Sequence, residues 1–332
     1  MCIRDSGYLE QADGTAWMAM FSLKMLQLSL EIAKHDSTYE DMATKYFEHF
    51  IYITEALNKL SDKWVGSWDE KEGFFYDILV LPNDSFIPIK IRSLVGLMTL
   101  NAVLHIDKET IQSLPQFYEN VKWFVKYRRK HRKYQVIENF KENEDFILSL
   151  VPKKRMKRLL NALIDEKEFL SPYGIRSLSK KHTKPYKVTI ENQEFSVQYT
   201  PAESDTFLFG GDSNWRGPIW IPTNFLFLLS LKEYHRYYGD KFTVPSPNEI
   251  GKKINLSELS ELLNKRLISM FEKNEHGDRP INKLHADFYR EPYFKDLVLF
   301  YEYFHGDNGR GVGAAHQTGW TGVIAHLIHE CC

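Results

Sequence analysis

Two kinds of helical pattern alternate along this 332-residue chain, and the alternation constrains its fold more than any other feature. Residues 17–32 and 218–231 are apolar almost all round, so the helices that they predict have to be buried on most sides. Residues 39–60 and 256–271 instead repeat apolar residues at three- and four-residue steps, which is typical of helices with one buried face. The alternation predicts an all-α chain in which an outer ring of helices wraps an inner ring, an (α/α) toroid.

The same patterns predict further helices elsewhere in the chain. These lie at residues 92–104, 114–128, 145–150, 153–164, 294–304 and 320–328. Residues 186–197 differ, because two β-prone runs flank Asn192-Gln193 and predict a small β-hairpin inserted in a long loop, residues 171–215. Loops of that length in a compact domain usually serve a function. A helical-repeat solenoid is the structural alternative, although the sequence shows no fixed period.

The beginning of the chain differs from the rest of it. Residues 1–6 (MCIRDS) continue no pattern, whereas a stretch dense in polar and aromatic residues starts at Gly7. The predicted helices number about ten, and a closed ring of six helix pairs needs about twelve. We therefore expect residues 1–6 to be a non-native leader and residues 7–332 to be a toroid that lacks its first helices. An intact short protein with an incomplete ring is the alternative.

Composition excludes several functional classes. The net charge is −1, so no basic excess indicates nucleic acid, and no apolar run reaches the length of a membrane span. The three cysteines (Cys2, Cys331 and Cys332) all lie at the ends, which excludes a disulfide framework. The histidines show no metal-ligand spacing. We expect a cytoplasmic protein without a cofactor, and the sequence leaves its oligomeric state open.

The candidate functional residues gather where helices meet loops. The most specific group is Asn214, Trp215, Arg216 and Trp220, around a proline (Pro218) that we expect in the first turn of a buried helix. A structural explanation needs few of these side chains, whereas a sugar subsite uses aromatic faces for stacking and amide or guanidinium groups for hydroxyl hydrogen bonds. The aromatic content of 14% suits either a large core or such stacking.

Other loops supply further candidates, each with a simpler reading beside it. Asp13 or Thr15 can serve only as a helix N-cap, and residues 73–77 can be a turn with core aromatics. Gly309–Gly313 resembles a phosphate loop, but no strand precedes it and we exclude nucleotide binding. The substrate-binding candidates are Tyr8, Gln11, Asp13, Trp17, Tyr76, Asp77, Tyr173, Arg176, His316, Gln317 and Trp320, and the catalytic candidate is Glu302.

Six motifs in order along the chain resemble glycoside hydrolase family 63, in its branch of mannosylglycerate hydrolases and processing α-glucosidases. They are YLEQADGTAWM, EGFFYD, SPYGIRSLS, NWRGPIW, FYEYFHGDNG and HQTGWTG. The resemblance implies an (α/α)6 catalytic domain and hydrolysis with inversion, with Glu302 as the general base. The family's general acid, an aspartate upstream of the first motif, has no counterpart before Tyr8, and Asp13 matches a subsite residue.

The predicted function is that of an inverting glycosidase for an α-glucosidic or α-mannosidic bond of an oligosaccharide or glycosyl-glycerate. Because the acid is missing, we expect the chain itself to be weakly active or inactive. The alternatives are a non-catalytic carbohydrate-binding toroid, a helical scaffold, and a different toroid enzyme such as an epimerase or lyase. The sequence leaves open the choice between glucose and mannose.

Overall fold

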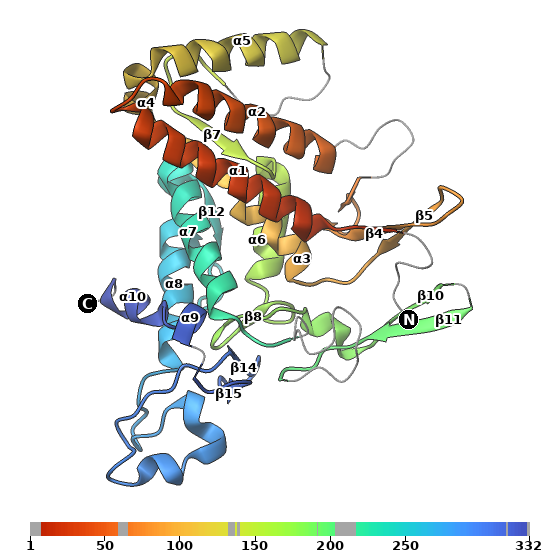
Figure 1. The fold of residues 1–332 in the computed structure, drawn as a ribbon. Coiled ribbons are helices and arrows are strands. Elements are labelled where there is room, and N and C mark those ends of the chain that lie inside the picture. The colour runs from red at the N-terminus through yellow and green to blue at the C-terminus, as the bar shows by residue number, and fades with distance from the viewer. Residues whose placement is uncertain are drawn as a thin grey trace. The chain divides into compact units, whose positions relative to one another are not determined.

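The computed structural model describes residues 8–58, 66–131, 137, 140–190, 192–202, 217–316 and 318–330 (Figure 1). The chain divides into two compact units. Unit 1 comprises residues 1–89, 95–159 and 232–242, and unit 2 comprises residues 90–94, 160–231 and 243–332. Helices α6 (Lys153–Leu163) and α7 (Ile221–Tyr238) contribute residues to both units.

Unit 1 combines long helices with short strands. Its elements are β1 (Tyr8–Glu10), α1 (Ala12–Ala33), α2 (Tyr39–Asn58), β2 (Trp68–Asp69), β3 (Phe74–Phe75), β4 (Asp77–Val80), β5 (Phe86–Ile89), α3 (Leu94–Leu97, whose first residue belongs to unit 2), the 3-10 helix η2 (Met98–Asn101), β6 (Val103–Ile106), α4 (Lys108–Ser113), α5 (Pro115–His131), β7 (Phe146–Ser149) and the 3-10 helix η4 (Gly239–Lys241). Strands β1, β4 and β5 form an antiparallel sheet, and β2–β3 and β6–β7 form two-stranded ladders.

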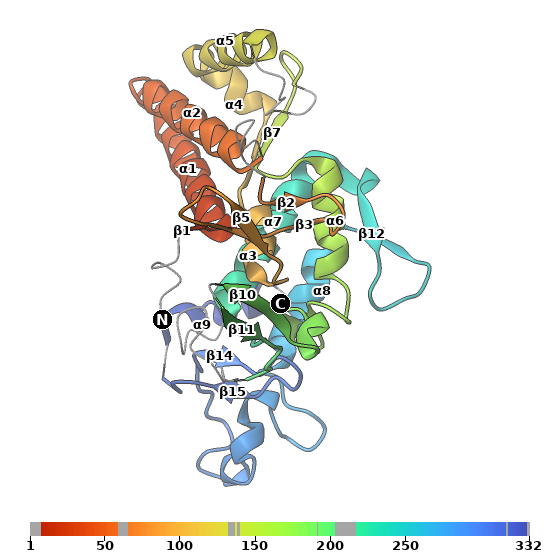
Figure 2. The same cartoon turned by 90° about the vertical axis from the view of Figure 1, so that its right-hand side faces the viewer.

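Helices α1 and α2 lie side by side (Figures 1 and 2). Helix α1 buries alanines and leucines at three- and four-residue steps, such as Ala16, Ala19 and Leu23. Helix α2 contributes buried Phe47 and Phe50, each 0% exposed. Small residues on one helix against large residues on the other allow close packing of the two helices. The periodicity of residues 39–60 therefore predicted a helix correctly, but its apolar repeat starts on the wrong face: Tyr39 and Met42 are 39% and 37% exposed, whereas Glu40 and Ala43 are buried.

The prediction that residues 17–32 are buried on most sides is wrong for α1. Met18, Phe21 and Leu28 are 57%, 58% and 57% exposed, and Trp17 and Ile32 are 40% and 44% exposed. Met18, Phe21, Met25, Leu28 and Ile32 follow one another at steps of three, four, three and four residues. Such spacing forms a continuous apolar stripe along one side of a helix. Helix α1 therefore has a buried face and a second, exposed apolar face.

Two apolar runs that we expected to be helical form strands instead. Residues 103–106, the end of the predicted helix 92–104, and residues 146–149, from the predicted helix 145–150, pair antiparallel as β6 and β7. Their registers include Val103 opposite Ser149 and Ile106 opposite Phe146. A short run of apolar residues fits a buried strand as well as a buried helix. Here the antiparallel pairing of two runs that lie 40 residues apart determines that both are strands.

Unit 2 contains the remaining elements. They are β8 (Leu170–Ser171), β9 (Gly174–Ile175), the 3-10 helix η3 (Lys180–Thr183), β10 (Tyr186–Ile190), β11 (Gln193–Val197), β12 (Thr243–Pro245), β13 (Lys253–Asn255), α8 (Leu256–Ser269), the 3-10 helices η5 (Pro280–His285) and η6 (Phe288–Arg290), β14 (Tyr303–Phe304), β15 (Gly311–Val312), α9 (Thr318–Thr321) and α10 (Ile324–His329). Strands β10 and β11 confirm the hairpin predicted at 186–197, with Tyr186 opposite Val197. Helix α8 begins with a capping box between Asn255 and Glu258.

Three predicted elements in unit 2 need correction. Residues 294–304 form no helix, because Phe304 exchanges two backbone hydrogen bonds with Ile219 and enters strand β14. The predicted helix 320–328 is split into α9 and α10. Helix α7 begins at Ile221, so Pro218 precedes the helix and does not occupy its first turn. Residues 221–231 of α7 are all buried or half-buried, as we predicted for that helix.

The all-α prediction is thus confirmed only in its coarser form. Helices are the larger elements, but the described residues also form one three-stranded and six two-stranded sheets. Among the described residues, no helix is both long and apolar enough to cross a membrane.

Candidate active site

Three extended segments that are far apart in the sequence lie side by side in unit 2. Arg176 pairs antiparallel with Ile219, and Ile219 pairs antiparallel with Phe304. The N–H groups of Ile219 and Phe304 each donate to the other residue's carbonyl oxygen, at 2.7 and 2.9 Å. Figure 2 shows β14 and β15, which continue the third segment, next to each other. These pairings bring described parts of three predicted motif loops to one place.

Glu302 lies directly before β14 and is half-buried. Its backbone is fixed at two points, because its N–H donates to the Ala314 carbonyl at 3.0 Å and its own carbonyl accepts from the Trp320 indole Nε1 at 2.9 Å. The carboxylate Oε2 accepts from the Ala314 N–H at 3.3 Å. The carboxylate therefore has a defined neighbour while the residue stays partly accessible.

The backbone opposite Glu302 contains one extra residue. Strands β14 and β15 pair Tyr303 with Val312, so a regular register would place Glu302 opposite Gly313. The N–H of Glu302 instead bonds to Ala314, and Gly313 adopts a φ of +72°. This is the arrangement of a β-bulge with glycine in the left-handed conformation, a device that redirects a side chain. The bulge thus determines the direction of the Glu302 side chain.

The glycine-rich stretch at 309–313 is explained by close packing. A Cβ at Gly309 would lie 2.9 Å from the Tyr173 ring, and one at Gly311 would overlap the Tyr301 ring. A Cβ at Gly313 would lie 2.6 Å from Oε2 of Glu302. Every second residue therefore has to be glycine for this strand to approach its neighbours, which agrees with our exclusion of a phosphate loop.

Trp220 and Trp320 flank the strand that comes after Glu302. The Trp220 ring stacks on Tyr303 with centroids 5.0 Å apart, and it meets Trp320 edge-on at 5.7 Å. Trp220 is only 6% exposed, whereas Trp320 is 44% exposed. Trp220 therefore packs beneath the site, and Trp320 is the ring with an accessible face. Sugar stacking by either residue stays a prediction.

Arg176, one of the substrate-binding candidates, is buried and does not face solvent. Arg176 is 3% exposed, and its Nη2 pairs with Asp307 Oδ1 at 3.0 Å. Its Nε donates to the Tyr199 hydroxyl at 3.1 Å, and its Nη1 donates to the Leu170 carbonyl. The guanidinium is therefore already engaged by protein groups. The sequence analysis missed Asp307, Tyr199 and Lys180, the last of which also pairs with Asp307. Among these three residues, Asp307 alone lies in one of the six motifs.

The other unit 2 candidates have less defined surroundings. Tyr173 is half-buried against Gly309, and His316 is exposed. Asn214, Trp215, Arg216 and Gln317 lie outside the described residues.

In unit 1, Asp77 serves as the N-terminal cap of α1. Its Oδ1 accepts the Ala12 N–H at 2.8 Å, while Gln11, the N-cap residue, makes no side-chain cap bond. Asp13 lies in the first turn and accepts from the Gly14 N–H at 2.7 Å, so neither Asp13 nor Thr15 is the N-cap. The cap of this helix therefore comes from a strand 65 residues away.

Burial raises the cost of ionising both Asp77 and Asp13. Burial and then the nearby Asp13 charge raise the pKa of Asp77 from 3.8 to about 7, although the Ala12 N–H opposes this. Burial likewise raises the pKa of Asp13. A carboxyl group with a raised pKa keeps its proton near neutrality and can donate a hydrogen bond or a proton.

The remaining unit 1 candidates are in different environments. Tyr8 in β1 is 52% exposed, Gln11 is exposed and Trp17 is 40% exposed. Tyr76 is 3% exposed, and its ring packs 5.4 Å from that of Phe74; contact of Tyr76 with a substrate stays a prediction. No cluster of three metal-ligating side chains occurs among the described residues of the chain.

Comparison with known proteins identifies the family. The model of the glycosyl hydrolase family 63 C-terminal domain matches residues 8–274, which is well over half of the chain. The chain belongs to glycosyl hydrolase family 63. The match ends before Glu302, so the family model does not by itself cover the proposed base.

The chain is also similar to several individual proteins. The chain is 44% identical over 340 residues to an uncharacterized protein of Saccharomyces cerevisiae, covering 98% of this chain and 31% of that protein. It is 27% identical over 186 residues to a probable mannosyl-oligosaccharide glucosidase of Schizosaccharomyces pombe, covering 55% of this chain and 17% of that one. A mannosylglycerate hydrolase structure from Thermus thermophilus aligns with 97% of this chain and 46% of its own, at 13% identity and a TM-score of 0.48. The chain thus spans less than a third of the length of these two curated relatives.

Proposed function

We propose that this chain carries the water-activating part of an inverting glycoside hydrolase, with Glu302 as the general base. The observation that carries the proposal is the bulge at Gly313, where the half-buried Glu302 donates its N–H to the Ala314 carbonyl and accepts, at its own carbonyl, the indole N–H of the accessible Trp320. Membership of the family supports a glycosidic substrate. A base at this position removes a proton from the water that attacks the anomeric carbon.

Inversion needs a second carboxyl group. One carboxylic acid protonates the leaving oxygen while the base activates a water on the opposite face, and the two groups stand roughly 6.5–9.5 Å apart. We propose that the acid lies outside this chain's motifs, because none of the six motifs supplies a counterpart of the family's acidic aspartate. The chain is then a weak catalyst or none for ordinary glycosides.

The proposed substrate has an α-glucosidic or α-mannosidic bond in an oligosaccharide or glycosyl-glycerate. One relative is described as a probable mannosyl-oligosaccharide glucosidase, and this description contains both sugars. Trp320 would stack on a sugar face. The other proposed subsite residues are Tyr8, Gln11, Asp13, Trp17, Tyr76, Asp77, Tyr173, Asn214, Trp215, Arg216, Trp220, His316 and Gln317. Arg176 would act by holding Asp307.

Glycosyl fluorides test the base without requiring the acid. Fluoride leaves without a proton, so an inverting site that has only its base still hydrolyses α-glucosyl or α-mannosyl fluoride. We expect the 332-residue chain to release fluoride and form the β-sugar, as followed by a fluoride electrode and proton NMR of the anomer. Glu302→Gln should abolish this release.

The outcomes separate the candidates. Formation of the α-sugar would overturn inversion, and fluoride release unchanged by Glu302→Gln would overturn the assigned base. Sugar binding without any turnover would favour a non-catalytic carbohydrate-binding protein.

We also propose that the domain is an (α/α)6 toroid that lacks its first helices in this chain. The exposed apolar stripe of α1 supports this, because its three- and four-residue steps are those of a surface that receives another helix. Adding the upstream region of a longer homologous chain should protect the amides of α1 from hydrogen exchange. Unchanged exchange in α1 would contradict the idea.

A further inference from the structure

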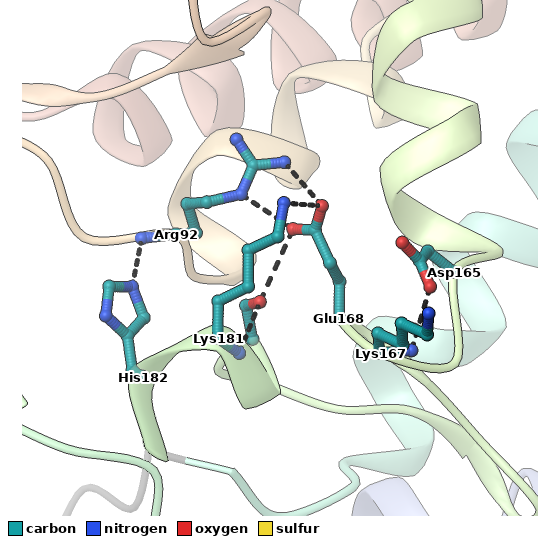
Figure 3. Close-up of polar contacts among 7 residues, drawn as sticks. Arg92, Asp165, Lys167, Glu168, Lys181 and His182 are labelled. Atoms are coloured by element: carbon teal, nitrogen blue, oxygen red, sulfur yellow. Dashed lines mark hydrogen bonds and ion pairs between the residues drawn. The ribbon is translucent and has the colours of Figure 1, made fainter. Parts of the chain in front are cut away.

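Unit 2 contains two arginine–carboxylate pairs of similar construction, each with a buried arginine; Glu168 is also buried, whereas Asp307 is half-buried. In the first, Arg92 Nε lies 2.6 Å from Glu168 Oε2, and Lys181 Nζ lies 2.6 Å from Oε1 of the same carboxylate (Figure 3). In the second, Arg176 pairs with Asp307 at 3.0 Å, and Lys180 Nζ lies 3.2 Å from Asp307 Oδ1. The two lysines are neighbours on η3, so one short helix adds a cation to each pair.

The two pairs differ in what they hold. The Arg92 pair fixes residues 90–94 against the chain around Glu168, and buried His182 accepts the Arg92 N–H at 2.9 Å (Figure 3). Burial lowers the pKa of His182 to about 4, so this ring is neutral and can accept. The contacts drawn in Figure 3 do not reach the segment of Glu302. The Arg92 pair therefore serves as an internal reference for the second pair.

The Asp307 pair acts on the hairpin that bears Glu302. Asp307 lies in the turn between β14 and β15, and its Oδ1 also accepts the Tyr199 hydroxyl at 3.0 Å. The same turn is tied by Gly306 N–H to the Pro201 carbonyl at 2.6 Å. Arg176 reaches this hairpin twice, through its guanidinium at Asp307 and through its backbone pairing with Ile219, which pairs with Phe304.

Charge complementarity makes this anchor strong. Three donors (Arg176 Nη2, the Tyr199 hydroxyl and Lys180 Nζ) converge on one carboxylate oxygen. Charge-assisted bonds of this kind are about twice as strong as neutral ones. Burial by itself would raise the pKa of Asp307, but the Lys180, Arg176 and Tyr199 contacts outweigh it and keep that pKa below its ordinary value. The anchor is therefore charged at neutral pH.

We propose that Asp307 is a positioning residue for Glu302, and that Lys180 is part of its function. The anchor fixes the tip of the hairpin while the Gly313 bulge fixes its base, so the Glu302 carboxylate is held from both ends. This inference rests on the proposed role of Glu302 as a base.

The neighbouring lysines provide a matched test. We would compare Lys180→Met with Lys181→Met, because each removes one partly exposed cation from an arginine–carboxylate pair whose arginine is buried. With α-glucosyl fluoride, Lys180→Met should lower kcat about tenfold with KM within about twofold, and Lys181→Met should leave both unchanged. Lys180→Arg should restore kcat, and Asp307→Asn should lower it about 100-fold.

A spectroscopic measurement keeps the test independent of activity. The Trp320 indole donates to the Glu302 carbonyl, so its N–H proton resonance, assigned with Trp320→Phe, reports the position of this segment. The resonance should shift in Lys180→Met and Asp307→Asn but not in Lys181→Met.

The results distinguish the two proposals. Indole shifts without turnover in any variant or wild type would count against the proposed function and support the positioning role. Unchanged kcat and unchanged indole resonance in Lys180→Met and Asp307→Asn would overturn the positioning role, as would an equal loss of kcat in Lys181→Met.

Discussion

Replacing Gly313 by alanine adds one methyl group at the bulge that directs Glu302. The new Cβ would lie 2.6 Å from Glu302 Oε2 and 2.7 Å from the Tyr303 ring, whereas ordinary contacts are 3.4–4 Å. The φ of +72° adds a backbone cost, because alanine in the left-handed region is roughly 1–2 kcal/mol less favourable. The carboxylate is the end of a flexible side chain, so it moves before the strand does.

The expected size of the effect follows from these distances. Relief of the contact requires a carboxylate shift of at least 0.8 Å, the difference between 3.4 and 2.6 Å. A misplacement of about 1 Å can lower a rate about 100-fold, which corresponds to about 2.7 kcal/mol in the activation free energy. The stability loss should exceed the backbone cost alone, because the new Cβ also lies 2.7 Å from the buried Tyr303 ring and 2.9 Å from the Glu302 Cβ, and these atoms have to shift as well.

Gly277 supplies the matched control. Its φ is +80°, and a Cβ there would meet nothing within 4 Å, so Gly277→Ala has the backbone cost without the contact. Hydrolysis of α-glucosyl fluoride and urea unfolding of both variants give the comparison. We expect a lower unfolding free energy in Gly313→Ala than in Gly277→Ala, and a kcat about 100-fold lower in Gly313→Ala only. A kcat of Gly313→Ala within about twofold of that of Gly277→Ala would refute the argument.

Three further predictions concern the charges and the surface. Asp77 has a pKa of about 7 in the folded state and 3.8 otherwise, so the folded state binds the extra proton between these pH values. The free energy of unfolding should therefore fall by up to about 4 kcal/mol as the pH rises from about 4 to 7. In thermal unfolding measured between about pH 4 and 8, Asp77→Asn should flatten this dependence. Glu168→Gln should lower the free energy of urea unfolding by about 3–5 kcal/mol, because it leaves buried Arg92 without its carboxylate. The control variant Glu249→Gln, in an exposed pair with Lys252, should leave the melting temperature unchanged. Phe21→Gln on the exposed face of α1 should change the unfolding free energy by less than about 0.5 kcal/mol and should reduce the binding of a dye that recognises apolar surface. Leu26→Ala on the buried face should lower the unfolding free energy by about 2–5 kcal/mol. A large loss from Phe21→Gln would show that this face is covered.

Local patterns predicted the elements whose stability depends on one buried face. Helices α2, α6 and α8 lie close to their predicted ranges, because apolar residues at helical spacing can be buried together only as a helix. The hairpin at 186–197 was found for a similar reason, since a turn at Asn192 with a φ of +65° joins two β-prone runs. The motifs likewise indicated the family from the sequence alone.

Apolar runs without such a pattern were decided by distant partners. Residues 146–149 became a strand because residues 103–106 lie opposite them, and the sequence of either run alone does not contain that pairing. The burial of α1 likewise depends on its partners. Its apolar residues predicted burial all round, but its second face has no covering element among the described residues.

The candidate site shows the same division most clearly. The sequence by itself predicted that Glu302 and Arg176 belong to functional loops, because residue type and order are local properties. Only the tertiary structure decided that Arg176 faces inward to Asp307 and that Gly313 redirects Glu302. Both depend on which backbone lies opposite. The register that pairs Arg176 with Ile219, 43 residues away, and Ile219 with Phe304, 85 residues away, cannot be read from any one of these segments.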